Sequence, residues 1–366
     1  MSGGGGDRHP RLGILVVASL LVVSISFHLS PPQSKHFKPR QQHTHTLVRY
    51  CIDEEEHYSL HCDDPNNNTF NEYAKLKFPF NCVESYFGIV GSCNGLICIS
   101  DDQFCYNHEA FLWNPLIRKF VPIPNPNITF TLRGPFIHSL GFGFDSASND
   151  FKVVRIVHLG LECDTVPPEV EIYTLKTGFW RIISDKALPY IVEERSQQAY
   201  INGVAHWVAR TPMDVGSFRM IVSFNMNDEV FREISFPDGI AGEEKLMERM
   251  SLVVFEETPC LIQHCQYHDD PHCLIWMMKE NGVVASWVKQ FRIDLCGGLR
   301  KPIGMRKNGE VLVAMRDGYL VSCDPKSKRI MNLGIVGFTD LYCYHSFAVD
   351  TYTESLGLLD KGVDFL

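Results

Sequence analysis

The chain has 366 residues, of which 45% are hydrophobic and 21% are charged, and its formal net charge is −9. This balance is ordinary for a packed globular protein of one large or two ordinary domains, and it excludes an intrinsically disordered chain. Because the net charge is negative and no long run of Lys or Arg occurs, a nucleic-acid partner is not expected.

The cysteines indicate a reducing environment. The 13 Cys are odd in number and scattered, and most fall inside apolar strand-like runs, as Cys98, Cys260 and Cys323 do. Small buried hydrophobic residues explain this placement better than a disulfide framework does. A reducing compartment is therefore predicted.

Residues 1–46 differ from the rest of the chain. They comprise a Gly-rich start, an uncharged apolar segment over 12–29, and a linker rich in Pro, His and Gln over 30–46. The apolar segment has the minimum length for a membrane-spanning helix, and the basic residues after it outnumber those before it. This pattern predicts a single-pass anchor with the following domain facing the cytosol.

Other readings of the apolar segment remain open. It could be a cleaved signal peptide, a buried core helix or an unusual gene-model start, and the last two place the protein in the cytoplasm or nucleus. The sequons at Asn67 and Asn127 matter only if the domain is luminal.

From Leu47 onward the chain consists of short β-type runs that repeat one phrase. An apolar run ends in a large or sulfur-containing residue, a polar turn follows, and a second apolar run comes next. In the five copies, the first apolar run ends at Trp113, Tyr173, Phe224, Trp276 and Cys323, and these residues are separated by intervals of 60, 51, 52 and 47 residues. A period near 50 residues in short strands is typical of a β-propeller, in which each repeat forms one small sheet.

Turn residues support two successive hairpins in each repeat. Asn94-Gly95, Asn202-Gly203 and Asn308-Gly309 each lie between apolar runs, and Asn-Gly suits a type I′ turn with positive φ at both residues. Two hairpins in succession make one four-stranded blade. The best candidate for a short helix is the segment 242–250.

The two ends of the repeat region complement each other. A hairpin that opens at Phe347–Asp350 and returns near Leu356–Leu359 has no repeat phrase after it, and a spare hairpin over Leu47–Cys51 and Tyr58–Leu60 precedes the first repeat. We expect both to join in one shared blade, because closure removes exposed sheet edges. The prediction is an all-β, kelch-like propeller of six blades over residues 47–366, preceded by a short hydrophobic helix. A flat repeat array or a β-sandwich is the alternative.

Seven segments in order resemble the F-box-associated interaction domain of plant F-box/kelch-repeat proteins. They are Gly91–Ile99, Leu112–Pro124, Gly141–Asp145, Asp150–Ile156, Val170–Arg181, Ile201–Trp207 and Ser223–Ile234. The resemblance implies a substrate receptor of Skp–cullin–F-box ubiquitin ligases, which binds a protein and has no catalytic activity or cofactor of its own.

The chain departs from this family at its N-terminus. An F-box is a helical module of about 45 residues that binds the Skp adaptor, whereas residues 1–46 show no such pattern. The resemblance therefore implies a protein substrate, while binding of the adaptor is not carried over. A membrane-anchored propeller receptor or a decoy outside the ligase is the alternative function, and a propeller enzyme is a second one.

One cluster of potential metal ligands occurs, within a short segment. It contains Cys260, His264, Cys265, His268, Asp269, His272 and Cys273. Zinc binds four N or S donors in pairs at close spacing, but this spacing is not that of a standard finger. We expect a polar hairpin loop between strands with buried Cys, and no catalytic, cofactor or metal residues are assigned.

The remaining polar candidates read as structural. His206 and His345 lie in or beside strands, where a histidine more often packs than acts as a base. Most of the five Trp are expected in the core, and one or two of them could line a binding face. The substrate-binding residues stay unassigned.

Overall fold

A computed structural model describes residues 44–53, 55–80, 87–101, 109–160, 167–193, 197–212, 218–238, 240, 249–266, 270–280, 286–337, 347–358 and 362–364. They belong to one compact unit, Gln42–Leu366. None of the helices in these ranges is long and apolar enough to span a membrane. The predicted apolar helix and anchor over 12–29 lie outside the described residues, and nothing in the described ranges supports an anchor.

Antiparallel strands form six sheets, each of which is one blade. The first blade holds β4 (Gly88–Cys93), β5 (Leu96–Asp101), β6 (Glu109–Asn114) and β7 (Lys119–Ile123). The second holds β8 (Phe136–Asp145), β9 (Asp150–Leu159), β10 (Glu169–Thr174) and β11 (Phe179–Ile182). The third holds β12 (Ile191–Val192), β13 (Ala199–Ile201), β14 (Val204–Arg210), β15 (Arg219–Asn225) and β16 (Phe231–Ser235).

The fourth blade holds β17 (Arg249–Phe255), β18 (Thr258–Gln266), β19 (Pro271–Met278) and β20 (Trp287–Asp294). The fifth holds β21 (Leu299–Met305), β22 (Val311–Met315), β23 (Tyr319–Cys323) and β24 (Ile330–Val336). The closing blade holds β25 (Phe347–Thr353), β1 (Thr44–Ile52), β2 (Glu55–Asp64) and β3 (Thr69–Leu76). Two short helices, α1 (Phe130–Arg133) and η1 (Ser184–Lys186), lie between blades, and β26 (Val363–Asp364) pairs with β7.

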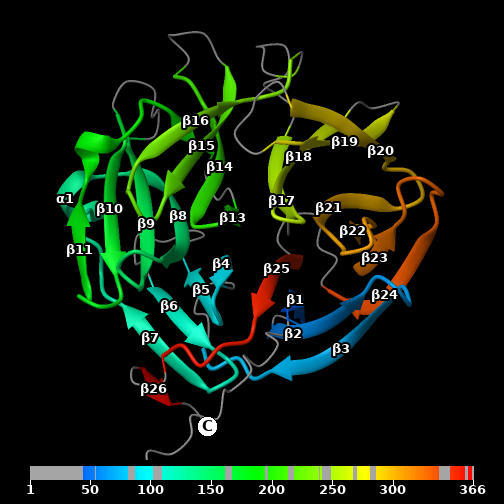
Figure 1. The fold of residues 1–366 in the computed structure, drawn as a ribbon, viewed down its shortest axis with the longest axis horizontal. Coiled ribbons are helices and arrows are strands. Elements are labelled where there is room, and N and C mark those ends of the chain that lie inside the picture. The colour runs from blue at the N-terminus through cyan, green and yellow to red at the C-terminus, as the bar shows by residue number, and fades with distance from the viewer. Residues whose placement is uncertain are drawn as a thin grey trace, which may run out of the picture. The chain divides into compact units, whose positions relative to one another are not determined.

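The blades follow one another around a ring (Figure 1). Neighbouring blades contact one another through their inner strands, from β25 to β4, β4 to β8, β8 to β14, β14 to β17, β17 to β21 and β21 back to β25; in the third blade β14 is the strand that follows the short inner strands β12 and β13. The predicted six-bladed propeller is therefore confirmed. The repeated phrase forms the last two strands of each of the five complete blades, as at β6 and β7 or at β15 and β16.

The hairpin turns agree with the Asn-Gly prediction at two of three places. Asn94 and Gly95 both have positive φ, 46° and 80°, and so do Asn202 and Gly203, 47° and 83°. The turn at Asn308 is different: only Gly309 has positive φ. The Asn308 side chain instead accepts a hydrogen bond from the backbone N–H of Glu310, at 3.0 Å, so this turn is held by a side chain.

The closing blade is shared between the chain ends, as predicted, but its division was predicted incorrectly. The N-terminal segment gives three strands rather than a hairpin, and the C-terminal segment gives only β25. β25 pairs with β1 in a register that places Leu47 opposite Asp350. The described residues after β25, 354–358 and 362–364, add no strand to this blade. This segment crosses to the first blade, where Asn114 Nδ2 donates to the carbonyls of Ser355 (3.0 Å) and Gly357 (2.8 Å).

Tryptophans join neighbouring blades, because a Trp packs in the core and still carries an indole N–H that can donate a hydrogen bond. Four of the five are buried, and Trp276 is half-buried. Three of them donate the indole N–H to a carbonyl of the preceding blade or its exit: Trp180 to Pro124 (2.7 Å), Trp207 to Leu140 (3.0 Å) and Trp287 to Ser235 (3.1 Å).

Buried cations of the second blade also donate hydrogen bonds to residues outside their own blade. Arg155 contacts Glu171 at 2.7 Å and also donates to the carbonyl of Ile128, which lies between the first and second blades. Lys152 of the second blade donates to the carbonyl of Met226 in the third, at 2.7 Å. A charge buried without a partner is costly, so each of these boundaries is specified by its pairing.

Candidate functional site: the channel mouth

The two ends of the ring differ in their connections. In the first two blades, short turns at 94–95, 115–118, 146–149 and 175–178 leave one end, while the longer connections 102–108, 124–135, 160–168 and 183–190 leave the other. We refer to the latter as the long-connection end. Functional residues of a rigid scaffold concentrate on such connections and on the surface that they surround.

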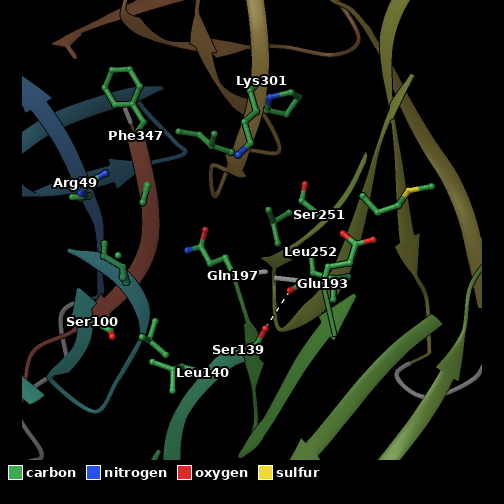
Figure 2. Close-up of a pocket in the computed structure, with 18 of the residues that line it drawn as sticks. Arg49, Ser100, Ser139, Leu140, Glu193, Gln197, Ser251, Leu252, Lys301 and Phe347 are labelled. Atoms are coloured by element: carbon green, nitrogen blue, oxygen red, sulfur yellow. Dashed lines mark hydrogen bonds between the residues drawn. The ribbon is translucent and has the colours of Figure 1, made fainter. Parts of the chain in front are cut away.

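A cavity of about 260 Å³ opens among the innermost strands at the long-connection end. We call it the channel mouth. All six blades contribute to its wall, with Arg49, Val90, Ser139, Glu193, Leu252 and Lys301 coming from different blades. Figure 2 shows these walls, with Lys301 extending toward the cavity and Gln197 projecting into it. The space accommodates one or a few side chains rather than a folded element.

Glu193 is the carboxylate of the mouth wall. Its carboxylate lies 3.3 Å from Arg219 Nε, and its backbone carbonyl accepts a hydrogen bond from the Ser139 hydroxyl at 3.2 Å (Figure 2). Burial raises the pKa of Glu193, although the neighbouring arginines, Arg219 first, oppose this. The Glu193 carboxylate therefore already forms an ion pair with Arg219. Its backbone is held in place by the hydrogen bond from Ser139 of the second blade.

Arg49 on the opposite wall is also paired. Its Nε donates to Glu56 Oε1 at 3.0 Å, and the same oxygen accepts the backbone N–H of Phe87 at 3.1 Å. Burial raises the pKa of Glu56 and the Arg49 charge lowers it. The pair links the closing blade to the start of the first blade, which makes it a structural contact of the mouth.

The channel continues from the mouth into a smaller space of about 70 Å³. Asp350 on β25 lines this inner part, where burial raises the pKa of its carboxyl to about 7. Its Oδ1 accepts the backbone N–H of Thr351 at 2.7 Å, which favours the charged form but does not compensate for burial. Near neutral pH the carboxyl is thus divided between its protonated and ionised forms.

Replacing Asp350 by asparagine should change how stability depends on pH. The folded carboxyl keeps its proton up to about pH 7 while the unfolded one loses it near pH 4, so ionisation opposes folding as pH rises between these values. A shift of one pKa unit corresponds to about 1.4 kcal/mol, and solvent screening of the partly exposed carboxyl reduces this effect. We therefore expect the wild-type unfolding free energy to fall by roughly 1–2 kcal/mol more than that of Asp350→Asn between pH 5 and 8. Urea unfolding at four pH values measures this.

The matched control for this prediction is Asp324→Asn on the surface. Its carboxyl has a pKa below the usual range, first because the Ser327 hydroxyl donates to it, so its removal should act in the opposite direction. The prediction would be contradicted if the free energy of unfolding changed by the same amount with pH in wild type and in Asp350→Asn.

The Cys and His cluster of the sequence falls on one hairpin of the fourth blade. Cys260, His264 and Cys265 lie on β18, and His272 and Cys273 lie on β19, while His268 and Asp269 lie outside the described residues. Register places His264 opposite Cys273 and Cys265 opposite His272, so adjacent pairs point to opposite faces of the sheet. Within the described ranges, no group of three or more potential ligands is arranged to hold a metal ion.

Both ring nitrogens of His264 have protein neighbours. Nδ1 lies 3.3 Å from the Cys273 thiol and Nε2 lies 3.1 Å from the Ser251 hydroxyl, and burial lowers the pKa of His264 to about 3. Burial likewise raises the pKa of Cys273 to about 12. These groups form a neutral buried network behind the mouth.

The other histidines of the sequence analysis are placed as follows. His206 on β14 is buried, its Nδ1 lies 3.0 Å from the Ala199 carbonyl, and its pKa is lowered by burial, which fits the packing role expected for it. His345 lies outside the described residues, as do residues 242–248 of the expected helix; Arg249 and Met250 instead begin β17.

Sequence reasoning did not identify the residues of the mouth. The available signal was the pair Arg300-Lys301 at the start of an inner strand, since two adjacent cations are unusual in a strand packed on both faces.

The fold and the channel mouth define a class of protein: a propeller whose central opening, walled by polar and apolar side chains, lies at the end that carries its longer connections. The sequence profile of the F-box associated beta propeller domain matches residues 46–354. Since this match spans the ring from β1 to β25, the chain belongs to the family of F-box-associated β-propeller proteins.

Relatives from Arabidopsis thaliana support the assignment. The chain is 29% identical over 325 residues to the F-box protein At3g07870, with 75% of each chain covered. It is 28% identical over 240 residues to the F-box/kelch-repeat protein At3g23880, with 65% of this chain and 62% of the relative covered. Among solved structures, TolB from Acinetobacter baumannii is similar with a TM-score of 0.44 and 12% identity, covering 85% of this chain and 66% of TolB.

Proposed function

We propose that this propeller binds a protein and presents it for ubiquitination as the receptor part of a Skp–cullin–F-box type ligase. The observation that carries the proposal is the family match over residues 46–354, together with its relatives, which are named as F-box proteins. The propeller itself performs no covalent step in this proposal, and recognition takes place at its long-connection end.

The mouth alone is too small for a stable protein complex. Such a complex buries about 800 Å² on each partner, which requires contacts well beyond a cavity of about 260 Å³. The mouth in the centre would take one anchoring side chain, and the rim would supply the remaining area.

The experiment is proximity labelling with the full chain, followed by measurement of the half-lives of the labelled proteins. If the proposal holds, at least one labelled protein is degraded faster when the chain is present and accumulates when it is removed. If the labelled proteins keep the same half-lives, the chain binds partners without directing their turnover.

The link to the ligase needs its own measurement. A Skp adaptor should be tested for co-purification with the full chain and with a chain that starts at Gln42. Stoichiometric binding by the full chain supports the ligase link, and loss of that binding in the shorter chain would contradict our prediction that residues 1–46 do not bind the adaptor.

A further inference from the structure

Lys301 is an accessible cation in the wall of the channel mouth. It lies on β21, and its ammonium extends toward the cavity in Figure 2. Burial lowers the pKa of Lys301, and the positive charges of Arg249 and Arg300 lower it further. Among the described residues, none places a hydrogen-bond acceptor or carboxylate against its Nζ.

The charges around Lys301 do not compensate it. Arg249 comes from β17 of the fourth blade, and Arg300 precedes Lys301 on β21. Burial keeps His264, which lies behind this wall, neutral, and the charges of Lys301 and Arg249 lower its pKa further. Glu193, the carboxylate that lines the mouth, lies 3.3 Å from Arg219 Nε and is already paired.

On the far wall, Arg49 is matched by Glu56, so that pair adds little net charge to the cavity. The inner end of the mouth adds a neutral donor: Gln197 Nε2 contacts the Val349 carbonyl at 3.3 Å and has a second N–H. The described part of the mouth therefore presents one uncompensated ammonium and an amide donor to a cavity of about 260 Å³. An ammonium that is partly desolvated beside like charges is stabilised when an anion enters.

We propose that the channel mouth binds an oxyanion carried by a peptide segment of the protein partner, either a carboxylate or a phosphorylated side chain, with Lys301 as its cation. The proposal rests on the proposed function, because it names the chemistry by which the partner is recognised. A single acidic side chain fits the volume, and a charge-assisted hydrogen bond in a low-dielectric cavity is stronger than one on the open surface.

The test uses the full chain and fluorescent peptides in matched sets. Each set has one sequence with a central Glu, Gln, Ser or phosphoserine, and anisotropy gives the affinity at low and at 0.5 M salt. Wild type should bind the Glu or phosphoserine peptide at least about 10-fold more tightly than its Gln or Ser counterpart, and salt should weaken this binding. Preference for phosphoserine or for Glu identifies which oxyanion is recognised.

Variants assign the binding to Lys301. Lys301→Met should lower the affinity about 10-fold or more and remove the preference for the charged peptide, while Lys301→Arg should keep it. The matched control is Lys328→Met in the same blade, where Lys328 is 77% exposed and pairs with Asp294 at 3.0 Å; its affinity should stay within about twofold. The urea midpoint of Lys301→Met should not fall, because the variant removes a desolvated charge that lies beside two arginines.

Two results would overturn the inference: equal binding of charged and neutral peptides by wild type, or an unchanged charge preference in Lys301→Met. The outcome is separable from that of the proposed function. If labelled proteins are turned over by the wild-type chain but either of these two peptide results is found, the receptor role stands and the oxyanion site fails. If charged peptides bind but no labelled protein changes its half-life, the site stands and the ligase role fails.

Discussion

Replacing Arg306 by methionine should lower the free energy of unfolding by about 3–5 kcal/mol, because it leaves buried carboxylates without their cation. Arg306, in the fifth blade, is 1% exposed, and it donates to Asp63 Oδ1 of the closing blade through Nη2 at 2.8 Å. Its Nη1 donates to Glu310 Oε2 at 2.8 Å and to Asn68 Oδ1 at 3.0 Å. One guanidinium thus fixes the last boundary of the ring. Urea unfolding followed by tryptophan fluorescence measures the change.

The chain contains a matched control for this prediction. Arg329 contacts the same Glu310 at 3.1 Å, but it is 60% exposed. Exposed ion pairs contribute about 0–1 kcal/mol, so Arg329→Met should lower the unfolding free energy by less than about 1 kcal/mol. Equal losses in the two variants would show that burial of the Arg306 cluster does not determine its contribution.

Arg306→Lys distinguishes charge from geometry. Lysine keeps the charge but offers one ammonium instead of a planar fork, so it cannot reach Asp63, Asn68 and Glu310 together. We expect it to recover less than half of the loss. Full recovery would mean that a single charge at this boundary is sufficient.

The blade architecture could be predicted because each repeat carries its own local signals. Apolar runs separated by polar turns recur with a nearly constant period, and the Asn-Gly pairs at Asn94 and Asn202 require positive φ, which few residues adopt. Closure by the chain ends followed from an unmatched hairpin at each end. These are short-range patterns, and the structure reproduces them.

The division of the closing blade could not be read in the same way. β3 has mostly exposed side chains with an irregular pattern, and its pairing with β2 includes a bulge between Leu60 and His61, so alternation does not identify it. The C-terminal hairpin was expected because Leu356–Leu359 is apolar. In the structure, Leu358 is buried against the first blade instead, which is a tertiary contact with no local signal.

The channel mouth was beyond sequence reasoning for a geometric reason. The pairing of β21 with β22 shifts between Leu299 and Lys301 and again between Pro302 and Gly304. Each shift changes which side chains face the channel, so alternation along the strand cannot tell that Lys301 enters the mouth. Pro302 is tolerated because this strand lies at the inner edge of its sheet, and a charge there also protects the edge.

Removal of β25 should have the largest effect on the fold. A chain ending at Gly337 loses the whole strand that pairs with β1 from Thr44 to Tyr50, together with the buried side chains of Phe347 and Tyr352. Losing one buried aromatic side chain costs about 3–5 kcal/mol, so two of them and a strand exceed the total stability of many domains. We expect this chain to lose cooperative urea unfolding and to aggregate through the exposed edge of β1.

A chain ending at Leu358 is the control, because it keeps β25 and the Asn114 contacts with Ser355 and Gly357. Among the described residues, it loses β26 with its short pairing to β7 and the exposed Lys119–Asp364 ion pair. It should unfold cooperatively, with a loss of about 1–2 kcal/mol at most for two exposed pairs of residues. Hydrogen exchange in the two chains localises the effect: amides of β1 and β2 should lose protection only when β25 is absent. Retained protection and cooperative unfolding in the chain ending at Gly337 would mean that the ring is stable without this strand. The propeller would then be stabilised mainly by contacts within each blade.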